Sequence, residues 1–190
     1  MRLIIASNNK HKIREIKEIL GSKFEEIVSL REAGIDHETV EDGTTFAENA
    51  YKKAREIAEI SGAASLADDS GICIDALDGA PGIFSARFAG EHGNDEANNA
   101  LVLEKLSGKT ERDAHYTCAI SLVYPDGTHV FSEGYMYGDI TASPRGNGGF
   151  GYDPLFVIKG ENRTVAEMSE EEKNAVSHRR RALDALLEKL

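Results

Sequence analysis

Two adjacent carboxylates have the clearest chemical potential in this sequence. Asp68 and Asp69 lie within the segment from Leu66 to Ile72, which is otherwise apolar and typical of a strand. A carboxylate beside a buried sheet is costly unless a cation or several hydrogen-bond donors balance its charge. The pair therefore indicates a metal ion or a polyphosphate as its partner.

The local conformation decides what each carboxylate can do. In an extended strand, consecutive side chains point to opposite faces, so only one of the two can point directly into a given site. We assign that role to Asp69, whereas Asp68 would orient a lysine, a water molecule or the loop. The alternative is that Asp69-Ser70-Gly71 forms a turn, in which local hydrogen bonds alone account for Asp68 or Asp69.

A second candidate is the polar segment that follows the first apolar run. It reads Ser7, Asn8, Asn9, Lys10, His11, Lys12. A loop that leaves a strand and opens a helix presents free backbone N–H groups and the positive end of the helix dipole, and both favour phosphate. Its lysines and histidine add cationic donors. The alternative is that Asn8 only caps the helix and the lysines are solvated. The spacing of a Walker A loop is absent from the chain.

A glycine-rich segment forms the third candidate. Gly146 to Gly151 formally fits the G-x-G-x-x-G pattern, but it precedes a strand and does not connect a strand to a helix, so we reject a dinucleotide-binding fold. Glycines beside Phe150 and Tyr152 suit a backbone that closely approaches a flat ligand, with an aromatic face for base stacking. A plain flexible loop is the competing interpretation.

Three further positions gain interest only in combination with these segments. Glu41 could supply another oxygen to Mg²⁺, because such ions usually take one or two protein carboxylates, with water and substrate phosphates completing the shell. Lys53 matters if its helix faces the site. In Ser177-His178-Arg179, basic residues in a first helical turn oppose the dipole, which indicates an anionic group nearby. Taken alone, Glu41 and Lys53 read as surface residues and Ser177 as a simple cap.

Strands and helices must position these groups, and the apolar pattern predicts them. The strongest hairpin signal is the alternation of residues 116–124, the turn at Pro125-Asp126-Gly127, and the aromatic residues beyond it. Capping-box spacings at Thr45 and Ser169 and a cap at Asn94 predict helix starts. The remaining predictions are strands at 3–6, 24–30, 71–77 and 155–158, a helix through 13–20, and a last helix that buries Leu183, Leu186, Leu187 and Leu190.

Composition bounds the fold class and the partners. A chain of 190 residues with 41% hydrophobic residues supports one folding unit with one core, over residues 1–190, and the central hairpin predicts a mixed α/β sheet. The formal net charge of −11 argues against a nucleic-acid or anionic-membrane surface. Cys73 and Cys118 read as buried free thiols. No signal peptide or membrane-spanning run is visible, so we expect a cytoplasmic protein.

Taken together, the segments resemble the inosine triphosphate pyrophosphatase family. The shared motifs occur in order along nearly the whole chain, which makes them more specific than any one alone. The first motif reads Ser-Asn-Asn where many members have Thr-Gly-Asn, a mild departure. The motifs are Ser7 to Lys12, Thr45 to Ala50, Ala67 to Gly71, Gly79 to Arg87, Gly149 to Pro154, Lys173, and Ser177 to Arg179.

The resemblance implies a fold, an activity and a set of site residues. The implied fold is an elongated mixed β-sheet with two α/β lobes flanking a nucleotide-binding cleft, assembled as a homodimer. The implied reaction converts dITP, ITP and XTP to the monophosphate and pyrophosphate with Mg²⁺, one or more ions per active site. Glu41 and Asp69 would bind the metal, and Asp69, with Asp68 beside it, would act in catalysis. The substrate-binding residues would be Ser7, Asn8, Asn9, Lys10, His11, Lys12, Lys53, Ser70, Phe150, Gly151, Tyr152, Asp153, Lys173, His178 and Arg179.

Three alternatives remain at the level of sequence. A related Maf-type pyrophosphatase would prefer pyrimidine or modified nucleotides. A non-catalytic nucleotide sensor could use the same phosphate and stacking loops, but it has no need of paired carboxylates and a metal. A nucleic-acid-binding module fits the acidic composition least well.

Overall fold

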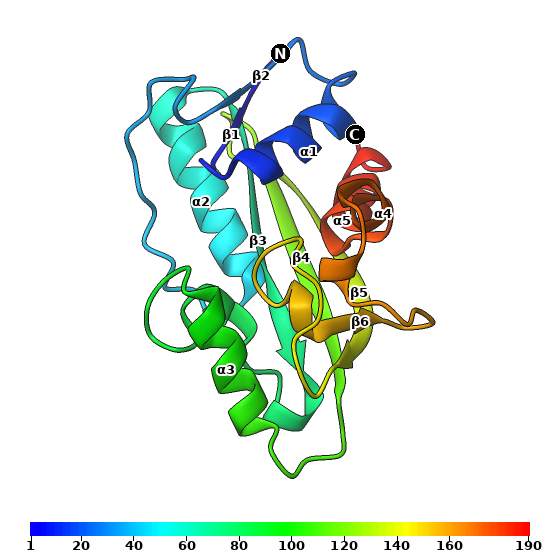
Figure 1. Cartoon of the computed structure of the whole chain (residues 1–190). Coiled ribbons are helices and arrows are strands. Elements are labelled where there is room, and N and C mark those ends of the chain that lie inside the picture. The colour runs from blue at the N-terminus through cyan, green and yellow to red at the C-terminus, as the bar shows by residue number, and fades with distance from the viewer. The chain divides into compact units, whose positions relative to one another are not determined.

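The chain folds into a mixed α/β structure built on one six-stranded sheet. The computed structural model describes all 190 residues, and the strand order is β2-β1-β3-β4-β5-β6 (Figure 1). The strands are β1 Arg2–Ile5, β2 Glu26–Ser29, β3 Ala64–Ile74, β4 Asp113–Val123, β5 His129–Ile140 and β6 Phe156–Ile158. The helices are α1 Lys10–Leu20, α2 Phe46–Ser61, α3 Asp95–Lys105, α4 Glu170–Val176 and α5 His178–Leu187, with short 3₁₀ helices at Asp75–Leu77, Gly82–Arg87, Asp153–Leu155 and Val165–Glu167.

Strand pairing makes the sheet mixed, as the sequence predicts. Strand β1 pairs in parallel with β2, where Ile4 lies opposite Val28, and in parallel with β3, where Ile5 lies opposite Leu66. Strand β6 pairs antiparallel with β5, where Ile140 lies opposite Phe156. The predicted hairpin is confirmed, since β4 and β5 are neighbours in the sheet and join through the turn at Gly127.

Local sequence signals set most helix ends. The Thr45 side chain accepts a hydrogen bond from Glu48 N–H, and Gly62 ends α2 in the left-handed conformation. Asn94 caps α3, and Ser169 forms a complete capping box with Glu172 at the start of α4. At α1, however, the cap is Asn9 and not the Asn8 that our alternative interpretation named.

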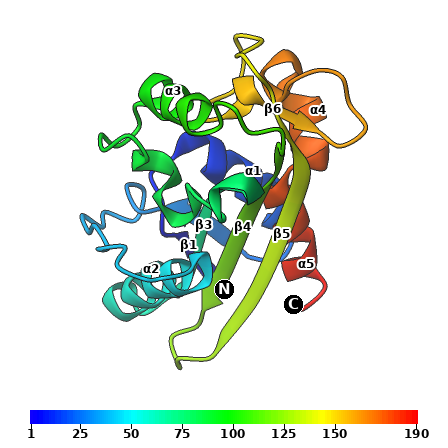
Figure 2. The same ribbon diagram turned by 90° about the horizontal axis from the view of Figure 1, so that it is seen from below.

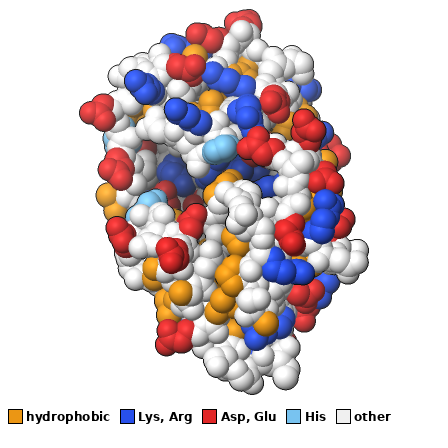
Figure 3. All heavy atoms as spheres, viewed as in Figure 1, with side chains coloured by type: hydrophobic (Ala, Val, Ile, Leu, Met, Phe, Trp, Pro, Cys, Tyr) orange, Lys and Arg blue, Asp and Glu red, His pale blue; other side chains and the backbone are white.

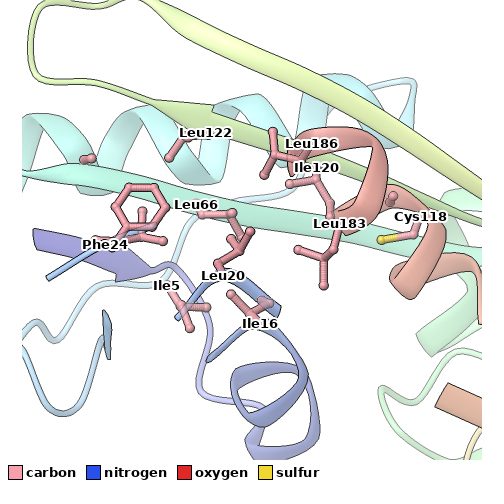
Figure 4. Packing of buried hydrophobic residues seen from close by; sticks show 13 residues of the cluster. Ile5, Ile16, Leu20, Phe24, Leu66, Cys118, Ile120, Leu122, Leu183 and Leu186 are labelled. Atoms are coloured by element: carbon pink, nitrogen blue, oxygen red, sulfur yellow. The ribbon is translucent and has the colours of Figure 1, made fainter. Parts of the chain in front are cut away.

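The chain divides into two compact units, and the first contains both termini. Unit 1 comprises Met1–Asp69, Cys118–Gly134 and Arg179–Leu190. Within it, α1 and α5 pack on one face of the strands through residues such as Ile16 and Leu183 (Figure 4). Helix α2 covers the opposite face through Ile57 and its alanines, and Figure 2 shows α2 and α5 on opposite sides of the strands. Unit 1 therefore has a layer of helices on each face of its strands.

Unit 2 comprises Ser70–Thr117 and Tyr135–His178 and has a core of its own. Phe156, fully buried, packs edge-on against Tyr116 with ring centroids 4.9 Å apart. Helix α3 contributes Val102 and Leu106 to the same cluster. Asp68 and Asp69 thus belong to Unit 1, whereas the glycine-rich segment 146–151 belongs to Unit 2.

Strand β3 runs further than the sequence suggests. It begins at Ala64, passes through both aspartates and ends at Ile74. The predicted strand over 71–77 is therefore confirmed for residues 71–74 and wrong for Asp75–Leu77, which form a 3₁₀ helix. The turn interpretation of Asp69-Ser70-Gly71 is also wrong, because all three residues are extended within the strand. Gly71 is needed there for space, since an added Cβ would clash with Ser85 Oγ. None of the helices combines the length and apolar character needed to cross a membrane.

The Unit 1 core predicts a large cost for truncating the α5 anchor. Leu183 is fully buried, so Leu183→Ala leaves a cavity and should lower the free energy of unfolding by about 2–5 kcal/mol. The same change at Leu190, which is 39% exposed, should have little effect. Urea denaturation of both variants measures the difference. Equal effects at the two positions would contradict this packing.

Candidate active site

The two aspartates occupy opposite faces of β3, as the alternation of an extended strand requires. Asp68 is 3% exposed and lies toward α1 and α5, because its partners come from those helices. Asp69 is 8% exposed and contacts α2. The consequence is that each carboxylate has a separate set of partners.

Asp68 is held in a buried network of charges. Its Oδ2 lies 2.8 Å from Lys12 Nζ and 3.3 Å from Arg179 Nε. Arg179 also donates from Nη1 to Glu15 Oε2 at 2.7 Å, and both residues are buried. Burial by itself disfavours the charged carboxylate, but Lys12 and Arg179 outweigh it and hold the pKa of Asp68 well below its usual range. Asp68 is thus ionised and forms ion pairs with two cations, Lys12 and Arg179.

Arg179 is correspondingly fixed in its charged form. Burial disfavours its charge, but the neighbouring Asp68 and Glu15 raise its pKa above the ordinary value. A guanidinium that forks between two carboxylates fixes the geometry of all three groups. Arg179 therefore links the start of α5 to both β3 and α1 within Unit 1.

Asp69 has a less fully compensated environment. Its Oδ2 accepts a hydrogen bond from Asn49 Nδ2 at 3.1 Å, and its Oδ1 lies 3.4 Å from Lys53 Nζ. Lys53 also donates to Glu41 Oε1 at 3.0 Å. Burial raises the pKa of Asp69, and although Lys53 opposes this, the net shift is upward, with Glu41 adding to it. Of the two aspartates, Asp69 is therefore the one whose negative charge is less fully compensated.

The donor set around Asp69 fits a hard divalent cation. Glu41 Oε1 and Asp69 Oδ1 lie 3.0 and 3.4 Å from the same ammonium group, that of Lys53. Burial disfavours the charge on Lys53, but Asp69, Asp68 and Glu41 outweigh it and raise its pKa, which shows that negative charge prevails here. No group of three or more His, Cys, Asp or Glu side chains is arranged to hold a metal. Two carboxylates match Mg²⁺, whose other ligands are usually water and phosphate oxygens.

The predicted phosphate segment is divided between two environments. Asn9 Oδ1 accepts from the N–H groups of His11 and Lys12 at 3.0 and 3.2 Å, and Ser7 Oγ accepts from Asn9 N–H at 3.1 Å. The first turn of α1 thus uses two of its amides in its own cap, so fewer are free for phosphate than the sequence suggests. Lys12 turns inward to Asp68, with its side chain 19% exposed.

The other residues of that segment face outward. Asn8 and Lys10 line a groove of about 870 Å³ along the outer side of α1, together with Arg14, Lys17 and Arg31. Figure 3 shows Lys and Arg side chains gathered over the part of the surface that carries α1. Within this groove Lys17 is already paired with Glu32 at 3.0 Å. The structure therefore brings Lys12 to the carboxylates and directs Lys10 elsewhere.

In Unit 2, the glycine-rich segment forms a shaped aromatic loop. Phe150 is 48% exposed, and Lys173 Nζ lies 4.2 Å from the centre of its ring. Asp153 accepts the Phe150 N–H at 3.0 Å and pairs with Lys173. Gly149 has φ +71°, and an added Cβ there would clash with Asp153. This loop is fastened by side-chain contacts, which argues against the flexible-loop interpretation.

Tyr152 and His178 are placed differently from Phe150. Tyr152 is 4% exposed and donates its hydroxyl to the Ser85 carbonyl at 2.7 Å, so its ring offers little surface for stacking. His178 is buried and stacks on Tyr116 with ring centroids 4.9 Å apart. Ser70, in β3, is half-buried. Of the two aromatic residues of the loop, Phe150 is the exposed one.

Two residues of the site escape the sequence analysis. Glu15 is a charged residue on the buried face of α1, beside Ile16 and four residues before Ile19. A charged residue at a position where the helical pattern calls for an apolar one is the signal that identifies it. Asn49 is 1% exposed, and its position in an apolar helical face gives the same kind of signal. Buried polar groups at such positions require partners.

Comparisons with known proteins agree on one family. The model described as the Ham1 family matches residues 3–189. A dITP/XTP pyrophosphatase of Clostridium perfringens is 50% identical over 100% of this chain and 97% of the relative, and one of Streptomyces coelicolor is 46% identical over 98% and 95%. The structure of the Staphylococcus aureus Ham1 protein matches with TM-score 0.91 at 39% identity, covering 100% of this chain and 99% of the other. A HAM1 protein from Coxiella burnetii matches with TM-score 0.92 at 38% identity, covering 100% of both chains.

The contrast between the two carboxylates predicts stability changes of opposite sign. Asp68→Asn removes the charge that balances Lys12 and Arg179, so it should lower the free energy of unfolding at neutral pH by about 3 kcal/mol. Asp69→Asn removes a charge that burial disfavours, so it should raise that free energy. Both substitutions are isosteric, and urea denaturation at pH 7 compares them directly.

The lowered pKa of Asp68 predicts how the free energy of unfolding changes at acid pH. A folded-state pKa below the unfolded value gives stability that is present above about pH 4 and is lost as the pH falls further. The Asp68→Asn variant should not show this loss of stability at acid pH, because it has no carboxylate to protonate at this position. The account is contradicted if both variants change stability in the same direction, or if the acid limb of Asp68→Asn equals that of the wild type.

Proposed function

Because the chain belongs to the Ham1 family, we propose that it hydrolyses non-canonical purine nucleoside triphosphates, such as dITP, XTP and ITP, to the monophosphate and pyrophosphate. The full-length similarity to relatives named dITP/XTP pyrophosphatase supports this substrate class. One observation carries the chemistry, namely a buried Asp69 of raised pKa between the amide of Asn49 and the ammonium of Lys53.

In this proposal Asp69 is the general base. Water attacks the α-phosphorus, Asp69 takes up a proton from that water, and the bond to the departing pyrophosphate breaks. A base whose pKa is raised toward the working pH accepts such a proton more effectively than an ordinary aspartate. Asn49 and Lys53 fix the orientation of the carboxylate before the reaction. Asp68, whose charge Lys12 and Arg179 already neutralise, suits a positioning role and not proton transfer.

Glu41 and Asp69 are the residues that would hold Mg²⁺. When bound, this ion would supply positive charge against the phosphate oxygens and the leaving pyrophosphate. Lys53, 13% exposed in its side chain, lies beside both carboxylates and can place its ammonium against a phosphate oxygen. Preorganised cations of this kind stabilise charge that develops in the transition state.

The loop of Unit 2 supplies features suited to a flat purine base. Phe150 presents an exposed aromatic face, and the adjoining Lys173 and Asp153 offer a donor and an acceptor. The 6-oxo group of hypoxanthine or xanthine accepts a hydrogen bond, whereas the 6-amino group of adenine would meet an unpaired donor. A site built in this way can reject the mismatched base by a factor of up to about 10⁴.

Assembly and location complete the proposal. We also propose a homodimer, which the resemblance to the inosine triphosphate pyrophosphatase family implies, and a cytoplasmic location, which we expect from the sequence. The two thiols, Cys73 and Cys118, are free, as expected of a reducing compartment. Burial raises the pKa of the Cys118 thiol, with the Asp68 charge adding to this shift, so Cys118 is a poor nucleophile.

A pyrophosphate-release assay tests the proposed function. With Mg²⁺, we expect pyrophosphate and monophosphate from dITP, XTP and ITP, and much slower release from dATP and dGTP. Asp69→Asn should lower kcat by about 10²-fold or more, because it removes the general base, while nucleotide binding persists. Asp126→Asn, in the hairpin turn, is the isosteric control and should retain activity.

Other outcomes of this assay would reject the proposal in distinct ways. Preference for dUTP or TTP over dITP would point to a Maf-type pyrophosphatase. Tight binding of ITP without turnover, across divalent ions and pH, would point to a nucleotide sensor. Release of orthophosphate would place the cleaved bond elsewhere in the triphosphate.

A further inference from the structure

The segment of residues 37–44 lies along α2 as a strap, and we use that name for it below. The segment runs beside α2 (Figure 1). Its side chains and amides contact the helix at successive turns. The contacts join Thr44 to Glu48, Gly43 to Asn49, Asp42 to Lys52, Glu41 to Lys53, and both Thr39 and His37 to Glu56. The helix residues follow a spacing that places them along one side of α2, so the strap runs antiparallel to the helix.

This arrangement determines where Glu41 lies. Without these contacts to α2, Glu41 would sample many positions, because its segment has no helix or strand of its own. On one side of Glu41, Glu56 Oε2 accepts from Thr39 Oγ1 at 2.7 Å. On the other side, Gly43 N–H donates to Asn49 Oδ1 at 2.9 Å. Glu41 is therefore held between two fixed points.

Asn49 is the anchor that also contacts the proposed general base. Its Oδ1 accepts from Gly43 N–H, and because a backbone N–H can only donate, this contact fixes which end of the amide faces the strap. The Nδ2 group must then face the opposite way, where it donates to Asp69 Oδ2 at 3.1 Å. One buried amide thus ties the segment bearing Glu41 to Asp69.

The local packing leaves little freedom for this contact to change. Asn49 is 1% exposed, so loss of either partner would leave a buried polar atom unsatisfied. An added Cβ at Gly43 would lie 2.6 Å from Asn49 Oδ1, so only glycine allows the backbone to come this close. Asn49 is the uncharged donor to Asp69, beside the charged Lys53.

We propose that Asn49 is a positioning residue for the reaction, which holds Asp69 and the segment bearing Glu41 in one fixed geometry. This inference rests on the proposed function, because it assigns Asn49 a role relative to the proposed base and metal ligand. Asn49 acts through Asp69 and Glu41 and does not itself need to touch the substrate. Misplacement of reacting groups by about 1 Å can cost about 10²-fold in rate.

Two variants of Asn49 separate its two contacts. Asn49→Ala loses both the acceptor for Gly43 and the donor to Asp69. Asn49→Asp is isosteric and keeps an acceptor for Gly43, but it replaces the donor with an oxygen that repels Asp69. Both variants should lower kcat on dITP by about 10- to 10²-fold, and KM should change by less than about 3-fold, since ground-state binding is not the affected step.

Hydrogen exchange of the Gly43 amide gives a readout that needs neither metal nor turnover. In the metal-free protein this amide should be protected in the wild type and in Asn49→Asp, and it should lose protection in Asn49→Ala. Asn98→Ala is the matched control. Asn98 is another buried asparagine, but it bonds only to the backbone of Ala86 and Ala89, so its variant should keep kcat within about 3-fold of the wild type.

The outcomes distinguish this inference from the proposed function. If the wild type releases no pyrophosphate from dITP, the proposed function fails. If the wild type is active but Asn49→Asp keeps kcat within about 3-fold, the positioning role is wrong even if Asn49→Ala does not fold. An equal loss of kcat in Asn98→Ala, or unchanged Gly43 protection in Asn49→Ala, would likewise overturn the inference.

Discussion

The separation of two neighbouring negative charges by a single extended strand is the constraint on which the site depends. Asp68 and Asp69 are both buried in β3, where each ionised carboxylate requires its own compensation. Because their side chains lie on opposite faces, one set of cations cannot serve both equally. In the structure, Lys12 and Arg179 both contact Asp68, whereas Asp69 contacts Lys53 at a longer distance.

This asymmetry links the stability of Unit 1 to its chemistry. Arg179 and Lys12 stabilise the ionised Asp68 and join α1, β3 and α5 around it. Asp69 is left with a raised pKa, because burial outweighs the opposing charge of Lys53. Perturbed carboxylates of this kind are characteristic of functional sites. The strap on α2 adds Glu41 to the same side and gives that side two carboxylates suited to a divalent ion.

Much of this arrangement follows from local sequence, and the rest depends on distant contacts. The opposite orientation of Asp68 and Asp69 needs only the alternation of a strand, and the starts of α2 and α4 need only their caps. In contrast, the sequence does not show that β3 continues through Asp69-Ser70-Gly71, because pairing with neighbouring strands overrides the turn tendency of these residues. The burial of Tyr152 likewise depends on Ser85, which lies far away in sequence.

The residues that sequence reasoning missed share one physical property. Glu15 and Asn49 are polar groups on buried helix faces, and their partners come from other elements. Periodicity identifies such positions as exceptions but cannot name the partner. At α1, two polar residues in a row were both able to cap, and only the structure shows that Asn9 forms the bonds.

Site-resolved titration of the two carboxylates tests the central claim most directly. Carbon-13 NMR of the side-chain carboxyl groups, assigned with the Asp68→Asn and Asp69→Asn variants, reports both pKa values in the metal-free protein. We predict that Asp68 stays ionised well below the ordinary range of an aspartate and that Asp69 takes up its proton at a pH above that range. Titration of both groups together, or in the reverse order, would contradict the account.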